Sequence, residues 1–372
     1  MNKSDSTRNE YNTSFSLQKK GYQRWWHHFS GTDPISGDTR VFFIEYFLLN
    51  PALSHEEPIL GQHPYNKKRG IRPSYIMMKV GVFGAFGKQL HNFYSGDKLQ
   101  VAFHPFIMSF GENFYSENRI TGWVEVDPED ARRKSFMCDS GYMEWDLELY
   151  QEIACHTGFL SDPFFCRLHA LDTFFHGNGI KTYFRGDVIL DGVRYQVTAD
   201  HCNGYSDKHF GRRFNAPWLQ FASNCLISEG SSLPLKHTAF VVDGCCPRFF
   251  CFPLKKRLLF QLTYKDQDYN FFFSGFLFRR RLKWMNKKTN KRFQLRLVAQ
   301  DKDIMIKLSG SCIREDMLPL NYEDPDGKRK DSPVYGDGNG EGTLLIYQKT
   351  SDGKQLLDTL TIKNALFIYC DS

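Results

Sequence analysis

The chain has 372 residues, of which 41% are hydrophobic and 16% aromatic, including 34 phenylalanines. This content excludes a globally disordered chain and suffices for a full apolar core. The net charge of +6 reflects 48 basic and 42 acidic residues, and the basic clusters are scattered over separate turn-like stretches. We therefore expect no nucleic-acid partner, while peripheral contact with an anionic membrane surface stays open.

The ten cysteines lack the spacing of a disulfide framework, since Cys245 and Cys246 are adjacent and no CxxC occurs. The polar N-terminus has no apolar signal-peptide core. The longest candidate apolar run, Phe271 to Phe278, is far shorter than the ~18 residues that span a bilayer. These features predict a cytoplasmic protein with reduced thiols and no transmembrane segment.

Strand patterns dominate the first half of the chain, after a polar lead-in over residues 1–18. "RVFFIEYFLL" (Arg40–Leu49) predicts a strand buried on both faces, and "RITGWVEV" (Arg119–Val126) alternates as a half-buried strand does. Asp127 and Pro128 suit the start of a short helix. The alternating apolar residues of "MEWDLELYQEI" favour a strand.

Hairpins are expected at four places in the second half. The strongest signal is Asp191-Gly192, and further turns are expected at Lys265–Asp268, between the halves of "KRFQLRLVAQDKDIMIKLSG", and at Ser351–Gly353. The glycine-rich Gly336–Gly342 is predicted to be a turn that precedes a strand. Short strands without βαβ alternation predict an all-β, mainly antiparallel protein. We expect two β units, over residues 19–212 and 213–372.

The stretch "GYQRWWHHF" (Gly21–Phe29) is predicted to be a strand. Trp25 and Trp26 would then point to opposite faces, as would His27 and His28, so that one ring and one imidazole share an inner face. The pair either fills the floor of a barrel or lines a ligand cavity. A metal site is not expected, because adjacent histidines on a strand diverge.

A second stretch, "GYSDKHFG" (Gly204–Gly211), places ionisable side chains beside aromatic ones. If it is extended, one face carries Tyr205, Asp207 and His209, and the other carries Ser206, Lys208 and Phe210. Asp207 and His209 could act as an acid–base pair, with burial raising the pKa of Asp207. The alternative is that Asp207 pairs with a nearby cation and stabilises a turn; the cations at hand are Lys208, Arg212 and Arg213. The residues alone leave both interpretations open.

These two stretches resemble motifs of the tocopherol cyclase family. The residues that match the central motif in order are Tyr205, Asp207, Lys208, Phe210, Gly211 and Trp218. "GYQRWWHHF" resembles that family's N-terminal tryptophan motif and the similar motif of carotenoid hydratases of the hydroxyneurosporene-synthase type. Gln23 and Arg24 stand where the family carries an acidic residue, and His209 and Phe210 replace an Asn-Trp pair. The resemblance implies two lipocalin-like β-barrel domains.

The resemblance also implies a reaction that needs no cofactor and no metal. Protonation of an alkene in an isoprenoid-type substrate gives a tertiary carbocation, which leads to cyclisation or hydration. The enzyme would be an intramolecular lyase or isomerase, or a hydratase. Asp207 would be the acid and His209 its partner, and the residues that line the substrate would be Trp25, Trp26, His28, Tyr205, Lys208, Phe210 and Trp218.

Two other functions remain as alternatives. A non-catalytic, lipocalin-like carrier of a hydrophobic ligand would use a barrel mouth without chemistry, and Asp207 would then be structural. A nucleic-acid-binding β protein would need its basic clusters to converge on one face beside exposed aromatic rings.

Overall fold

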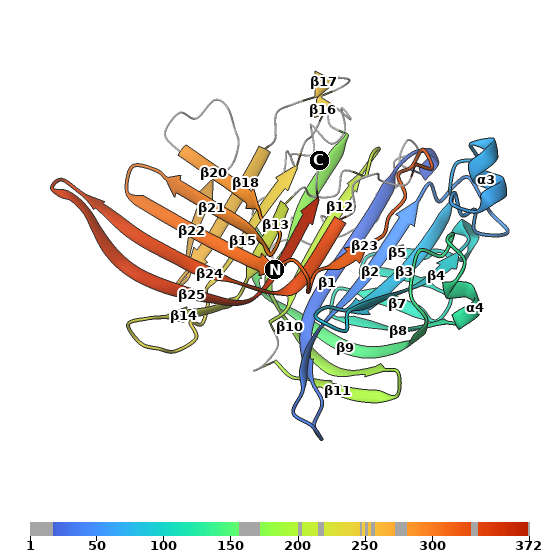
Figure 1. Cartoon of the computed structure of the whole chain (residues 1–372), viewed down its shortest axis with the longest axis horizontal. Helices are drawn as coiled ribbons and strands as arrows, with labels where there is room; N and C mark the ends of the chain where they lie inside the picture. The colour runs from blue at the N-terminus through green and yellow to red at the C-terminus, as the bar shows by residue number, and fades with distance from the viewer. Residues whose placement is uncertain are drawn as a thin grey trace.

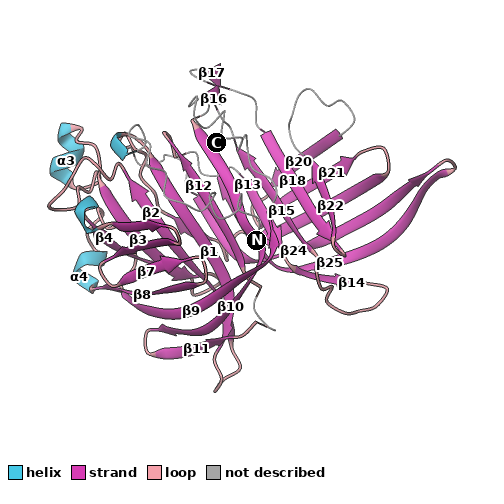
Figure 2. Cartoon of the chain, turned by 180° about the vertical axis from the view of Figure 1, so that it is seen from behind, coloured by secondary structure: helices cyan, strands magenta, loops and turns pink. Residues whose placement is uncertain are grey.

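The structure, a computed structural model, describes residues 18–155, 172–199, 203–214, 219–245, 248–249, 252–253, 257–271, 281–328 and 334–370. Its strands form two large antiparallel sheets that lie side by side (Figure 1). Figure 2 shows that helices are few and short. The predicted all-β, antiparallel fold is therefore confirmed. Among the described residues, no helix has the length and hydropathy needed to cross a membrane.

The first sheet has twelve strands, and it curls until β4 lies beside β8. Its strands are β1 (Tyr22–Thr32), β2 (Thr39–Leu49), β3 (Tyr75–Val82), β4 (Lys88–Tyr94), β5 (Gln100–Phe103), β6 (Phe106–Phe110), β7 (Asn113–Ser116), β8 (Arg119–Val126), β9 (Gly141–Ala154), β10 (Thr173–Leu190), β11 (Val193–Val197) and β12 (Tyr205–Gly211). Short helices α3 (Pro64–Arg69), η1 (Gly96–Lys98) and α4 (Pro128–Ala131) lie in its connections.

The second sheet has eleven strands and forms a half-barrel whose edge strands are β19 and β20. Its strands are β13 (Leu219–Ser223), β14 (Cys225–Ser228), β15 (Ala239–Cys245), β18 (Arg257–Tyr264), β19 (Gln267–Phe271), β20 (Arg281–Lys288), β21 (Arg292–Gln300), β22 (Ile304–Ile313), β23 (Leu318–Leu320), β24 (Val334–Thr350) and β25 (Gly353–Cys370). A separate small pair joins β16 (Arg248–Phe249) to β17 (Phe252–Pro253). The boundary predicted after residue 212 falls between β12 and β13.

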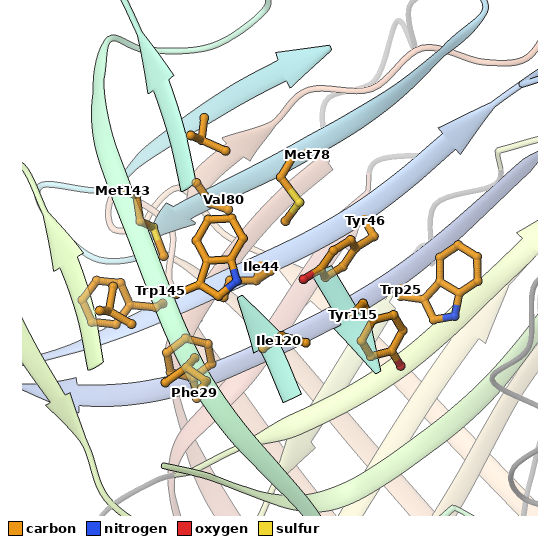
Figure 3. Packing of buried hydrophobic residues seen from close by; sticks show 14 of the residues in the cluster. Trp25, Phe29, Ile44, Tyr46, Met78, Val80, Tyr115, Ile120, Met143 and Trp145 are labelled. Carbon is orange, nitrogen blue, oxygen red and sulfur yellow. The ribbon is translucent and has the colours of Figure 1, made fainter. Parts of the chain in front are cut away.

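Three apolar clusters hold these sheets together. One fills the inside of the first sheet, with Trp25, Tyr46, Tyr115 and Trp145 among its members (Figure 3). A second fills the inside of the second sheet. The third contains residues of both sheets, such as Trp26 from β1 and Val241 from β15, so it forms the interface between them. β2 contacts both the first and the third cluster, which explains its burial on both faces from Val41 to Leu49.

The strand and hairpin predictions agree with the structure. β10 and β11 turn at Asp191-Gly192, where the positive φ values of 48° and 84° suit the two central residues of a tight hairpin. β18 and β19 turn at Lys265-Asp266, β21 and β22 at residues 301–303, and β24 and β25 at residues 351–352. The lead-in up to residue 17 lies outside the described residues.

The turn predicted at Gly336–Gly342 is wrong, because these residues lie inside β24. The pairing of β24 with β25 shifts register between Asp337 and Gly342, so the strand is bulged there. A Cβ at Gly338 would overlap the side chain of Val41 on β2. Gly338 thus serves close approach between the sheets rather than a chain reversal.

We therefore expect Gly338→Ala to destabilise the fold by about 1–3 kcal/mol, because the stiff, buried Val41 must move to accommodate the methyl group. Gly230→Ala is the matched control, since no heavy atom comes closer than 3.8 Å to a Cβ at that position. Urea unfolding of both variants measures the difference. Equal stabilities would contradict the assigned packing.

Candidate functional site

β1 lies between β2 and β12, and its side chains alternate between the two faces of the first sheet. Trp26 and Asp207 are directly opposite each other on β1 and β12, as are Trp25 and Lys208. Trp26 belongs to the interface cluster, whereas Trp25 belongs to the inner cluster. The two strands therefore present one set of side chains to the inside of the first sheet and another to the interface.

The inner face carries Trp25, His27, Lys208 and Phe210. Lys208 Nζ lies 4.6 Å from the ring centroid of Trp25 and 5.3 Å from that of Phe210, so the ammonium contacts two aromatic faces. His27 Nδ1 lies 2.9 Å from Ser206 Oγ. Because Lys208 points to this side, it does not serve as the counter-ion of Asp207.

The interface face carries Trp26, His28, Tyr205, Asp207 and His209, all of them buried. The ring of Trp26 stacks on Phe43 with centroids 5.0 Å apart. The strand geometry thus brings five of the predicted site residues to one side of the sheet. Trp25, Lys208 and Phe210 lie on the other side, and Trp218 lies outside the described residues.

A buried ion cluster lies on this interface, centred on the fully buried Glu45 of β2. Arg24 Nε donates to Glu45 Oε1 over 2.8 Å. The hydroxyl of Tyr322, which follows β23, donates to Glu45 Oε2 over 2.9 Å. Lys79 Nζ of β3 lies 3.6 Å from the same oxygen and donates to the backbone carbonyl of Asn321 over 2.9 Å. One carboxylate therefore joins three strands of the first sheet to the segment after β23.

The protonation of the two cations follows from this environment. Burial lowers the pKa of Lys79 to about 8, although the neighbouring Glu45 raises it. Burial also acts to lower the pKa of Arg24, but the negative charges around its guanidinium raise it above its ordinary value. Arg24 is therefore a permanent positive charge in the interface, and its guanidinium carbon lies 4.6 Å from the centroid of Trp26.

Asp207 lies beside this cluster and receives hydrogen bonds from the second sheet. Gln220 Nε2 of β13 donates to Asp207 Oδ2 over 2.6 Å and to the Tyr205 hydroxyl oxygen over 2.8 Å. Oδ1 of Asp207 has no hydrogen-bond partner among the described residues, and the residue is fully buried. Burial raises the pKa of Asp207, while Arg24 and the hydrogen bonds of Gln220 and Tyr205 lower it in part.

A second buried carboxyl, Asp243 on β15, lies close to the first. Asp243 is directly opposite Gln220 on the neighbouring strand, so their side chains are neighbours on one face. Both oxygens of Asp243 and Oε1 of Gln220 lack a hydrogen-bond partner among the described residues. Burial raises the pKa of Asp243 well above its ordinary value, and the charge of Asp207 raises it further. Asp243 therefore retains a proton far more readily than an exposed aspartate.

His209 lies at the edge of this carboxyl pair as a neutral imidazole. Its Nε2 is 3.8 Å from Asp207 Oδ1, which is beyond hydrogen-bond distance. Burial lowers the pKa of His209 well below its ordinary value, and the positive charge of Arg24 lowers it further. The site therefore combines a neutral base with two carboxyls that hold protons more strongly than usual.

The sequence patterns did not reveal most of the buried polar residues at this interface: Glu45, Lys79, Gln220, Asp243 and Tyr322. Three of them share a signal, since each is a lone charge inside an apolar strand: Glu45 in "FFIEYFLL", Lys79 in "YIMMKVGV" and Asp243 in "AFVVDGC". A lone buried charge needs a partner or a change of protonation, so such positions point to a cluster.

Two pockets lie away from these carboxyls. The larger has a volume of about 1020 Å³ and lies on β7 to β10 of the first sheet. Phe114, Leu149, Tyr183 and Arg185 are among its lining residues, and Asp207 is not. The smaller, of about 240 Å³, lies between Arg212 and Asp326.

Compared by sequence, the chain matches no family profile and no curated protein. Among solved structures it is similar to kievitone hydratase from Nectria haematococca, at 9% identity and a TM-score of 0.42, over 98% of this chain and 94% of that one. It is also similar to an AttH-type protein from Nitrosomonas europaea, at 9% identity and a TM-score of 0.40, over 98% of each chain. Likeness of this degree carries no inference about function.

We expect Glu45→Gln to destabilise the protein by about 3–5 kcal/mol, because Arg24 and Lys79 would lose their buried counter-ion. Asp146→Asn provides the control, since it breaks an exposed ion pair with Arg119 that solvent screens and that contributes little to stability. Urea unfolding measures both. A loss at Glu45 no larger than that at Asp146 would contradict the assigned role.

The buried His28 predicts a pH-dependent stability. Burial lowers the pKa of His28 from 6.5 to about 3. Between these values the unfolded chain binds a proton that the folded chain does not, so acidification favours unfolding. His28→Gln should flatten the dependence of the unfolding free energy on pH by about 1.4 kcal/mol per unit in this window. His63→Gln, at an exposed position, is the control, and an unchanged slope for His28→Gln would refute the prediction.

Proposed function

We propose that the chain is an enzyme that protonates an apolar, isoprenoid-type small molecule without a cofactor, and that Asp207 delivers the proton. The observation that carries this proposal is Oδ1 of Asp207, a fully buried carboxyl oxygen with no hydrogen-bond partner among the described residues. A carboxyl in such a place is stabilised by keeping its proton, and it can release that proton to a bound substrate. The tocopherol cyclase-like motif residues around it support the same chemistry.

The reaction follows from the groups at the interface. The π electrons of a substrate alkene form a C–H bond with the proton of Asp207, leaving the carboxylate and a tertiary carbocation. The aromatic rings of Trp26 and Tyr205 lie on the same face and stabilise positive charge. A hydroxyl of the substrate closes a ring on the cation, or water adds to it. The oxygen then releases its proton, which returns to Asp207 and completes the cycle.

Asp243 and His209 support the acid in this proposal. Asp243 holds a second proton next to Gln220, which donates to Asp207, so the pair titrates as a coupled unit rather than as two separate acids. His209 is a neutral imidazole at rest, and it accepts the proton transiently and passes it on. Because Asp207 is fully buried, the substrate reaches it only when the packing between the sheets opens.

The alternative is a non-catalytic carrier of a hydrophobic ligand. The pocket of about 1020 Å³ on the first sheet favours it, because this volume matches that of small-molecule sites and the pocket does not include Asp207. Under this alternative, the Asp207 cluster is structural and serves only to join the two sheets.

The test uses prenylated quinols and polyenes as substrates in deuterated water. Protonation of the alkene places one deuterium on the carbon next to the new C–O bond, and mass spectrometry detects it. We expect Asp207→Asn to lower turnover by roughly 100-fold or more, because the general acid is lost. Asp187→Asn, on the exposed part of β10, is the matched control and should keep full turnover.

Two results would decide against the enzyme. A fully active Asp207→Asn variant removes Asp207 from the chemistry. A protein that binds such lipids, as shown by native mass spectrometry and organic extraction, but gives no deuterated product with any of them would support the carrier instead.

A further inference from the structure

The outer face of the second sheet is formed by β20, β21, β22, β24 and β25, which lie side by side in Figure 1. Inward-pointing and outward-pointing side chains alternate along β21, and this alternation defines the outer face. Phe293, Leu295 and Leu297 are buried in the inner cluster, so Arg292 and Arg296 point outward. The register of the neighbouring strands then assigns the rest of the face.

Basic residues dominate this outer face. Those that the register places on it are Lys283, Lys287, Arg292, Arg296, Lys307, Lys349 and Lys354. They come from sequence segments that lie far apart, so the face appears only when the sheet has formed. Among the described residues at these outward positions the acidic side chain is Glu341, and Arg292 binds it.

Within the described part of the chain, much of this positive charge has no ionic partner. Lys283, Lys287 and Arg296 form no ion pair with any described residue, and Lys307 Nζ lies 5.2 Å from the ring centroid of Tyr347. Charges of one sign on one face repel each other, which costs stability unless a partner neutralises them.

The outer face of the first sheet shows the opposite arrangement. Arg119 pairs with Asp146 and Arg194 pairs with Asp187, while Glu148 lies directly opposite Arg185. Charges of both signs thus alternate there. The excess of positive charge found on the outer face of the second sheet is therefore not shared by the outer face of the first sheet.

Exposed apolar side chains stand among the lysines of the basic face. Met285 is 55% exposed, Leu356 50% and Ile313 42%. The aromatic ring of Tyr347 on this face is half-buried against Lys307, and the large exposed aromatic side chains, such as Phe86 and Tyr150, lie elsewhere. Flexible cations around apolar side chains suit lipid head groups above acyl chains, whereas stacking of nucleic-acid bases needs exposed rings.

We propose that the outer face of β20, β21, β22, β24 and β25 docks on an anionic lipid surface. The lysine and arginine side chains bind the phosphate and carboxylate groups of the lipids, and Met285 and Leu356 enter the boundary between head groups and acyl chains. This docking is independent of the chemistry at Asp207, and it holds for a carrier as well as for an enzyme.

The experiment is sedimentation of the full chain with phosphatidylcholine vesicles, with and without about 30% phosphatidylserine, at about 0.1 M salt. Binding is expected only to the vesicles with phosphatidylserine. The variant Lys283→Gln, Lys287→Gln, Arg296→Gln should bind them roughly 100-fold more weakly, because each cation near the surface contributes separately. The control Arg132→Gln, Arg133→Gln, Lys134→Gln removes the same charge from the exposed connection after α4 of the first sheet and should bind like the wild type.

A second variant tests whether the face binds lipid rather than any anionic partner. Met285→Ser with Leu356→Ser should weaken vesicle binding while leaving the melting temperature unchanged. Fluorescence anisotropy measures how tightly the wild type binds a short DNA duplex, which is an anion without acyl chains. The proposal is overturned if the wild type ignores anionic vesicles, if the two charge variants bind alike, or if the duplex is bound more tightly than the vesicles through the same cations.

Discussion

The fully buried carboxylate of Glu45 is the interaction on which the arrangement of this protein depends. It lies in the middle of an apolar strand, and an unpaired charge there would cost more than the fold can support. Arg24 and Lys79 bring two cations from the strands on either side, and Tyr322 brings a hydroxyl from the segment after β23. The same contacts that satisfy Glu45 therefore fix how the second half of the chain packs on the first sheet.

The consequence for Asp207 is electrostatic. Arg24 and Lys79 supply two positive charges beside the buried carboxyls of Glu45, Asp207 and Asp243. Both cations lie directly against Glu45, so the ionised forms of Asp207 and Asp243 are stabilised less by positive charge. A carboxyl without enough compensation keeps its proton, and Asp243 is the least compensated, since none of its oxygens has a described partner. The interface thus holds a proton-bearing group next to Asp207 as a result of how the sheets are joined.

Much of the fold could be predicted from the sequence, because strand alternation and turn residues act locally. The face shared by Tyr205, Asp207 and His209 followed from period two, as did the separation of Trp25 from Trp26. The partners of Asp207 could not be predicted, because Gln220 and Asp243 reach it through the packing of one sheet on another. The glycines at 336–342 were misread for the same reason: the small size of Gly338 serves contact with Val41 on the other sheet, which no local pattern reveals.

The most direct test is a carbon-13 NMR titration of the aspartate carboxyl groups in the wild type and in Asp207→Asn. We predict that Asp243 titrates at a clearly higher pH than an exposed aspartate in the wild type, and that its pKa falls when the carboxyl at position 207 is replaced by an amide. If Asp243 instead titrates like an exposed aspartate in the wild type, with a pKa that the substitution does not change, then the two carboxyls are not coupled and the acid site described at this interface does not exist.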